Sequence, residues 1–123
     1  MSQDILERLR ERFPADVLGI DRYRGDASAT LRPESVLEVA RFVKDDPALR
    51  FDMPMDVTAV DYIGQEPRFE VVYHLYSTVH HHRLRLKARV PQQDPTLPSI
   101  TPVWLGANWL ERETYDMYGI RFS

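Results

Sequence analysis

The sequence predicts an α+β domain of two layers, a largely antiparallel five-stranded sheet with helices packed on one face. Its 123 residues suit one compact domain, here taken as residues 1–123. The apolar pattern changes along the chain between the period of a helix and that of a strand. The predicted strands are joined by short turns, which favours antiparallel neighbours. The expected order is helix, two strands, helix, three strands and helix.

The first helix is predicted to end before Pro14, because a proline disfavours helical backbone in the residue before it. Its apolar residues form one stripe on an otherwise charged segment: Ile5, Leu6, Leu9 and Phe13. Residues 17–31 are then typical of a hairpin, in which VLGIDRY and ASATL flank a turn at Arg24-Gly25-Asp26.

The second helix is expected to begin at Pro33, which suits a first helical turn, and to stop at Asp46-Pro47. Its buried stripe is predicted to be Val36, Val39, Ala40 and Val43. From residue 51 onward the apolar period becomes two, which is the period of a strand.

Three strands are predicted, at 55–62, 68–77 and 83–90, with a loop at 64–67 between the first two. Pro54 indicates that the first of them starts after this residue or lies at a sheet edge. Residues 91–98 contain three prolines and are expected to form a crossing loop outside any sheet. A last helix is predicted at about 105–118, with Gly119 as the residue that terminates it.

Composition excludes several classes of function. The chain has no cysteine, which removes disulfides, thiolate catalysis and cysteine-ligated clusters. A net charge of −3 gives no reason to expect nucleic acid. No apolar run reaches the length of a membrane span, and the first residues are too charged for a signal peptide. These features indicate a cytosolic or peripheral protein.

Histidines form the first candidate site. His74 lies on a predicted strand and His80, His81 and His82 lie in the turn after it. Three adjacent rings in a tight turn do not converge easily on one metal ion, so a solvated hairpin tip is expected. His74 shares a strand face with Glu70 and is expected to be its surface partner.

A basic stripe is the second candidate, and its members are Arg83, Arg85, Lys87 and Arg89. They alternate with apolar residues and therefore share one face of a strand. This face is either the solvent side of an antiparallel sheet, with Glu70 as a cross-strand partner, or a surface for an acidic partner, a phosphate or a membrane.

Signals for catalysis are lacking. The five glycines form no phosphate-binding loop, and no serine has a nucleophile-elbow pattern. Composition and motifs therefore indicate a non-catalytic domain.

The last predicted helix carries the third candidate. Trp109, Arg112, Glu113 and Asp116 fall on one of its sides, and Trp104, Ala107, Glu111 and Tyr115 on another. Arg112 is within reach of Asp116, and Arg121 could return toward the helix end. Acids in the last turns oppose the helix dipole, which indicates that these charges serve a surface outside the helix or ties to the next loop.

At this helix the sequence resembles the 30 kDa subunit family of respiratory complex I, the NADH–quinone oxidoreductase of bacteria. ERETYDMYGIRF resembles the signature of that family. RFDMPMDVTAVDY resembles its first core strand, RFEVVYHLYS and RLRLKARV its central hairpin, and PSITPVWLGANWLERE its approach to the signature. The resemblance extends from the helix at Pro33 onward.

The resemblance implies a structural subunit in the peripheral arm of a proton-pumping complex. It would dock against the 49-kilodalton subunit close to the quinone-reducing module, called the quinone-module subunit below. NAD, FMN, Fe–S clusters and quinone would belong to partner subunits, and no catalytic residue is implied here. A structural and docking role carries over to Glu111, Arg112, Glu113 and Asp116, with Trp109 and Gly119 in the same signature. The location implied is the cytoplasmic side of a bacterial inner membrane or the mitochondrial matrix side.

One departure is that the family usually continues past the signature into an arginine- and proline-rich tail, whereas this sequence stops at Phe122-Ser123. We therefore expect the domain core without that tail. Two alternatives stay open. One is an equivalent subunit of a related membrane-bound hydrogenase or dehydrogenase, and the other is a free-standing metal- or anion-binding module built on the histidines and the basic stripe.

Overall fold

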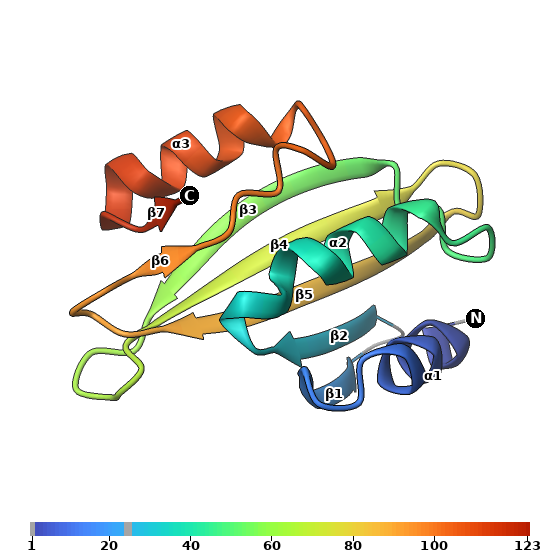
Figure 1. The fold of residues 1–123 in the computed structure, drawn as a ribbon, viewed down its shortest axis with the longest axis horizontal. Coiled ribbons are helices and arrows are strands. Elements are labelled where there is room, and N and C mark those ends of the chain that lie inside the picture. The colour runs from blue at the N-terminus through green and yellow to red at the C-terminus, as the bar shows by residue number, and fades with distance from the viewer. Residues whose placement is uncertain (1, 24–25) are drawn as a thin grey trace.

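The computed structural model describes residues 2–23 and 26–123, and the side chains of residues 5–22 and 26–123 (Figure 1). The predicted turn at Arg24-Gly25 lies outside the described residues. The elements in chain order are α1 (Ser2–Arg12), β1 (Val17–Tyr23), β2 (Asp26–Leu31), the 3-10 turn η1 (Pro33–Ser35), α2 (Val36–Asp45), β3 (Met53–Asp61), β4 (Phe69–Ser77), β5 (His82–Val90), β6 (Thr96–Leu97), α3 (Ala107–Tyr118) and β7 (Arg121–Phe122).

Five strands form one sheet in the order β1-β2-β5-β4-β3. Three of the four neighbouring pairs are antiparallel, and only β2 and β5 run parallel. The predicted fold class is confirmed. The parallel pair arises because the chain leaves β2, crosses through α2, and builds the hairpin β3–β4 before β5 is inserted beside β2 (Figure 1).

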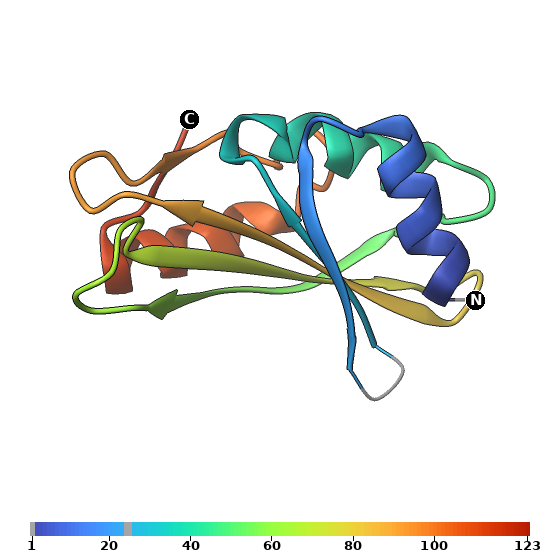
Figure 2. The same cartoon turned by 90° about the horizontal axis from the view of Figure 1, so that it is seen from below.

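The helices cover one face of this twisted sheet (Figure 2). The strands alternate as predicted, so that Leu84, Leu86, Ala88 and Val90 of β5 are buried and the basic residues between them are not. The predicted apolar stripes of α1 and α2 are all buried in the same core. α3 joins this core over β3, where the Thr114 hydroxyl donates to the Val57 carbonyl at 3.0 Å.

Pro54 lies inside β3, which is an edge strand, and the register shifts between Pro54 and Asp56. The expectation of an edge position is confirmed, because only there does a missing N–H leave no neighbour unpaired. Gly119 ends α3 with a φ of 73°, and its N–H donates to the Tyr115 carbonyl at 2.7 Å. Its predicted role as the terminating residue is also confirmed.

The prediction of a crossing loop outside any sheet at 91–98 is wrong in part. Thr96–Leu97 pairs in parallel with Arg121–Phe122 and forms a second, two-stranded sheet. Proline lacks a backbone N–H donor but keeps its carbonyl acceptor. The Pro95 carbonyl accepts from the Arg121 N–H at 2.8 Å. The Ser123 N–H donates to the Leu97 carbonyl at 2.9 Å. Pro95 and Pro98 therefore flank the strand pair and do not interrupt it.

Candidate functional site

The signature helix α3 divides into two flanks. Its inner flank is formed by Ala107, Glu111 and Thr114, which are buried. Its outer flank is formed by Trp109, Arg112, Glu113 and Asp116, which are exposed. The predicted grouping of these four residues on one side is therefore confirmed, since their spacing of three, four and seven residues keeps them together on a helix. The second predicted group is wrong in part, because Tyr115 is exposed whereas Ala107 and Glu111 are buried.

Glu111 is only 5% exposed, and its carboxylate points into the chain that precedes the helix. One oxygen accepts from the Ser99 hydroxyl at 2.7 Å and the Thr101 hydroxyl at 3.2 Å. The other accepts from the Ile100 N–H at 2.8 Å. Glu111 therefore fastens α3 to residues 99–101.

Tyr73 of β4 lies near this buried carboxylate. Burial, and then the negative charge of Glu111, raise the pKa of the Tyr73 hydroxyl. Among the described residues this hydroxyl has no hydrogen-bond partner. The pair adds polarity to the core beneath α3 in a place that the sequence pattern does not reveal.

Two further side chains fix the position of α3: Thr114, and Trp104, which was predicted to lie on the helix but precedes its first residue. Thr114 is 3% exposed, and its hydroxyl reaches both the Val57 carbonyl of β3 and the Leu110 carbonyl. The Trp104 indole N–H donates to the Phe51 carbonyl at 2.9 Å. The only sequence signal for this contact is that a threonine lies within a helix. That signal does not identify the strand carbonyl that accepts the hydrogen bond of Thr114.

The outer flank is exposed and polar, and it adjoins apolar surface. Trp109 is 65% exposed, and exposed apolar side chains continue before it at Leu105 and after it at Tyr115 and Met117. Among the described residues, Arg112, Glu113 and Asp116 make no side-chain hydrogen bond or ion pair. The expected contact of Arg112 with Asp116 is absent there. Arg121 pairs with Asp94 at 3.3 Å, and it also lines a pocket beside α3 with Arg112 and Tyr115, so its expected return toward the helix is confirmed.

The acids of α3 lie where they oppose the helix dipole, as the sequence predicted. The helix has no acid in its first turn and no base in its last turn, where Asp116 lies. Acids at this end are unfavourable beside the negative end of the helix dipole. The arrangement does not stabilise the helix, so its charges are available to another surface.

The basic stripe lies on the outer face of the sheet, opposite the helices. Arg85 pairs with Asp26 at 3.1 Å, and Arg83 lies over the Tyr76 ring. Glu70 is opposite Arg89 in register, but its carboxylate accepts from the Tyr62 hydroxyl, and Arg89 binds the loop after β3. The expected cross-strand ion pair is therefore replaced by contacts to that loop.

His74 lies on the same outer face and is half-buried. Its pKa is lowered, first by burial and then by the positive charge of Arg85, and Asp56 opposes this shift. In the strand register His74 stands between Asp56 and Arg85. Its neighbours are thus a carboxylate and a guanidinium, and the expected contact with Glu70 is absent from the described residues.

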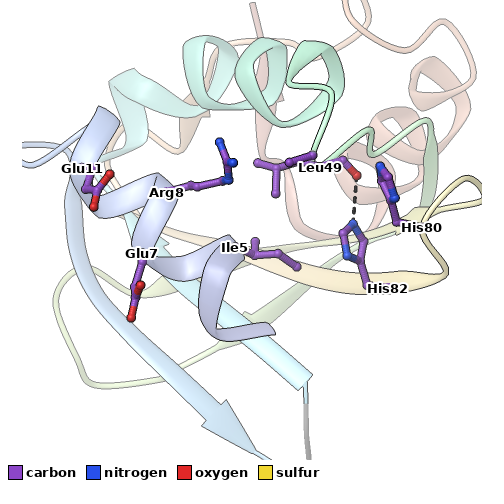
Figure 3. Close-up of a pocket in the computed structure, with 8 residues that line it drawn as sticks. Ile5, Glu7, Arg8, Glu11, Leu49, His80 and His82 are labelled. Atoms are coloured by element: carbon purple, nitrogen blue, oxygen red, sulfur yellow. Dashed lines mark hydrogen bonds between the residues drawn. The ribbon is translucent and has the colours of Figure 1, made fainter. Parts of the chain in front are cut away.

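The histidine turn closes a pocket of about 500 Å³ between α1 and the loop after α2 (Figure 3). His80 donates from Nε2 to the Pro47 carbonyl at 2.8 Å, and His82 donates from Nε2 to the Leu49 carbonyl at 2.9 Å. His82 also stacks on Phe51. The prediction of a solvated tip is wrong for these two rings, because they hold residues 47–49, and it stands for the exposed His81.

The described part of the chain contains neither a metal-binding cluster nor a membrane-spanning helix. Residues 5–22 and 26–123 contain no group of three or more histidine, aspartate or glutamate side chains that could hold a metal ion. No helix within the described residues is long and apolar enough to cross a membrane.

Known proteins similar to this chain share both its sequence and its fold. Residues 29–123 match the family described as respiratory-chain NADH dehydrogenase, 30 Kd subunit. The NADH-quinone oxidoreductase subunit designated C in Roseiflexus sp. (strain RS-1) is 51% identical over 97% of this chain and 68% of its own length. The protein of the same designation from Geobacter sulfurreducens is 47% identical over 94% of this chain and 71% of its own length.

Two solved structures resemble the whole domain. A trypsin-resistant fragment of Nqo5 has a TM-score of 0.82 and 31% identity, and the match covers 100% of this chain and 96% of that one. A chain of the membrane-bound sulfane sulfur reductase, an archaeal respiratory membrane complex, has a TM-score of 0.81 with 23% identity over 98% of this chain and 69% of that one. The second likeness shows a shared fold.

Proposed function

The chain belongs to the 30 kDa subunit family of respiratory-chain NADH dehydrogenase, and we propose that it is a non-catalytic structural subunit that docks against the quinone-module subunit through the outer flank of α3. Its role is positional. It holds its neighbours in the geometry that electron transfer from NADH to quinone requires, on the peripheral side of the membrane. NAD, FMN, Fe–S clusters and quinone are held by other subunits.

The observation that carries this proposal is the contrast within one helix between satisfied and unsatisfied polar groups. Glu111 and Thr114 are buried and hydrogen-bonded, whereas the charges of the outer flank have no partner in the described residues. Tryptophan, tyrosine, methionine and arginine are enriched at protein interfaces, and all four occur on the exposed surface of α3. An exposed helix surface whose charges have no partner among the described residues suits a subunit contact.

The named relatives support this reading over a related membrane-bound hydrogenase, since the curated relatives near 50% identity are subunits of NADH-quinone oxidoreductase. The absence of cysteine from the sequence supports a chain that ligates no cluster through thiolates.

A binding measurement between this chain and the quinone-module subunit encoded with it tests the proposal. Arg112→Ala and Glu113→Ala should each weaken binding about tenfold, as truncation of an interface residue that carries binding energy does. Arg10→Ala, which removes an exposed charge from α1, is the matched control and should bind like the wild type. If both α3 variants also bind like the wild type, the docking role of the outer flank is wrong.

A further inference from the structure

The loop between β3 and β4, residues 62–68, presents an isoleucine to solvent. Ile63 is 78% exposed, at the second position of a turn that the Gln65 N–H closes on the Tyr62 carbonyl at 2.9 Å. Gly64 follows with a φ of 85°, the conformation that a type II turn requires at its third position. The backbone thus fixes the direction in which Ile63 projects.

The base of this loop is closed by an ion pair. Arg68 binds Asp61 with two parallel hydrogen bonds, from Nε at 2.7 Å and from Nη2 at 2.8 Å. The backbone adds a bond from the Tyr62 N–H to the Arg68 carbonyl at 2.8 Å. Paired bonds between a guanidinium and a carboxylate fix orientation as well as distance.

Arg89 of the basic stripe braces the loop from the sheet. Its guanidinium lies 4.3 Å from the centre of the Tyr62 ring. It also donates to the Pro67 carbonyl and, at 3.5 Å, to the Gln65 side chain. Tyr62 in turn donates its hydroxyl to Glu70 at 3.3 Å. One member of the stripe thus holds three residues of the loop in place.

These braces do not bury Ile63. A short hairpin connection can be made without an exposed branched apolar side chain, and this one contributes nothing to the core. A rigid loop that presents an apolar tip loses little conformational entropy when the tip enters a pocket. The loop is therefore preorganised to place Ile63 against a partner.

The charges around Ile63 indicate which charge a partner surface would carry. In this region Arg68 faces Asp61, and Arg89 lies opposite Glu70. Glu66 is exposed next to the tip and makes no side-chain hydrogen bond or ion pair among the described residues. The unbalanced charge beside Ile63 is negative, which complements a basic surface.

The loop is joined to the last turn of α3. The Arg68 guanidinium lies over the Phe69 ring at 5.2 Å, and Phe69 packs edge-on against Tyr118 with ring centres 6.4 Å apart. Asp116 and Met117, which are exposed, belong to the same turn as Tyr118. The loop and the outer flank can therefore meet one partner at the same time.

We propose that residues 62–68 form a second contact with the quinone-module subunit, in which Ile63 enters an apolar pocket rimmed by basic side chains. This inference rests on the proposed function, because it takes the partner from there. The contact is independent of the signature helix in sequence and is linked to it in space through Phe69 and Tyr118.

The test measures binding of Ile63→Ser to the quinone-module subunit. We expect about a tenfold loss of affinity, as for an apolar anchor at an interface. Leu18→Ser is the matched control, since Leu18 is 65% exposed on β1 at the opposite edge of the sheet. It should bind like the wild type, and both variants should unfold at the wild-type urea concentration.

Two further variants separate the parts of the inference. Arg89→Ala releases the brace without touching the tip, and it should weaken binding by less than Ile63→Ser does. Glu66→Lys should slow association most at low salt, because it reverses the charge that faces a basic rim. If Glu66→Lys associates as fast as the wild type at low salt, the proposal of a basic rim on the partner is wrong.

The outcomes distinguish this inference from the proposed function. If Ile63→Ser binds like the wild type while Arg112→Ala is weakened, the loop contact is wrong and docking through α3 stands. If Ile63→Ser is weakened and the α3 variants are not, the loop is the contact and the role of the outer flank is wrong. If the wild-type chain does not bind the quinone-module subunit, both proposals fall.

Discussion

Each of the two flanks of α3 contains a glutamate, and the two glutamates are used in opposite ways. On the inner flank, Glu111 is 5% exposed and accepts three hydrogen bonds. Two positions later, Glu113 is exposed on the outer flank and has no partner among the described residues. The side chains are chemically identical, so position on the helix alone decides which carboxylate serves the fold.

This difference allows one short segment to serve the fold on its inner flank and the proposed docking on its outer flank. The spacing of two residues between Glu111 and Glu113 turns them to different sides of the helix. The inner carboxylate fixes where α3 lies on the sheet, and that placement determines where the outer charges point. We therefore expect substitutions on the inner flank to lower stability, and substitutions on the outer flank to affect binding alone.

Glu111→Ala is expected to have the largest effect. It removes a buried acceptor and leaves the Ile100 N–H, bonded at 2.8 Å in the wild type, without a partner. Loss of bonds to a charged group, with a buried donor left unsatisfied, should lower the free energy of unfolding by about 3 kcal/mol. Urea denaturation followed by circular dichroism measures this.

Glu113→Ala is the control for that measurement, because it deletes the same atoms two residues away. Its free energy of unfolding should stay within about 0.5 kcal/mol of the wild type. Equal losses in the two variants would show that the flanks do not differ in the way that their burial indicates.

Thr114→Val should have a smaller effect on the same flank. The substitution keeps the shape of the side chain and removes the bond to the Val57 carbonyl, 3.0 Å long, that joins α3 to the edge strand β3. A loss of about 1 kcal/mol is expected, the usual net contribution of one neutral hydrogen bond. Thr114→Ser keeps the hydroxyl and should retain more stability than the valine variant, and a reversed order would show that the bond to β3 does not hold the helix.

The sequence predicted the fold class because apolar spacing reports which face of an element is buried. It placed the stripe of α2 and the alternation of β5 correctly, and it predicted the terminating role of Gly119 from glycine's access to positive φ. It missed the pairing of Thr96–Leu97 with Arg121–Phe122, since two-residue strands give no periodic signal and prolines beside them suggested a loop.

The candidate site was less predictable for a related reason. Helical spacing grouped Trp109 with Arg112, Glu113 and Asp116, and this grouping needs no knowledge of the tertiary structure. The partners of Glu111 lie 10 to 12 residues away along an irregular segment. Those of His80 and His82 are backbone carbonyls 33 residues away. Contacts of this kind depend on how the chain crosses itself, which local pattern does not specify.

The smallest effect on stability is expected at Trp109, the first residue of the outer flank. Trp109 is a large side chain, and its truncation in a core would cost several kcal/mol. It is 65% exposed, however, and most of its surface already contacts water in the isolated chain. Trp109→Ala should therefore change the free energy of unfolding by no more than about 0.5 kcal/mol in urea denaturation. A loss above about 1 kcal/mol would show that the indole packs within this chain. The outer flank would then serve the fold as the inner flank does, and its aromatic surface could no longer be assigned to a partner.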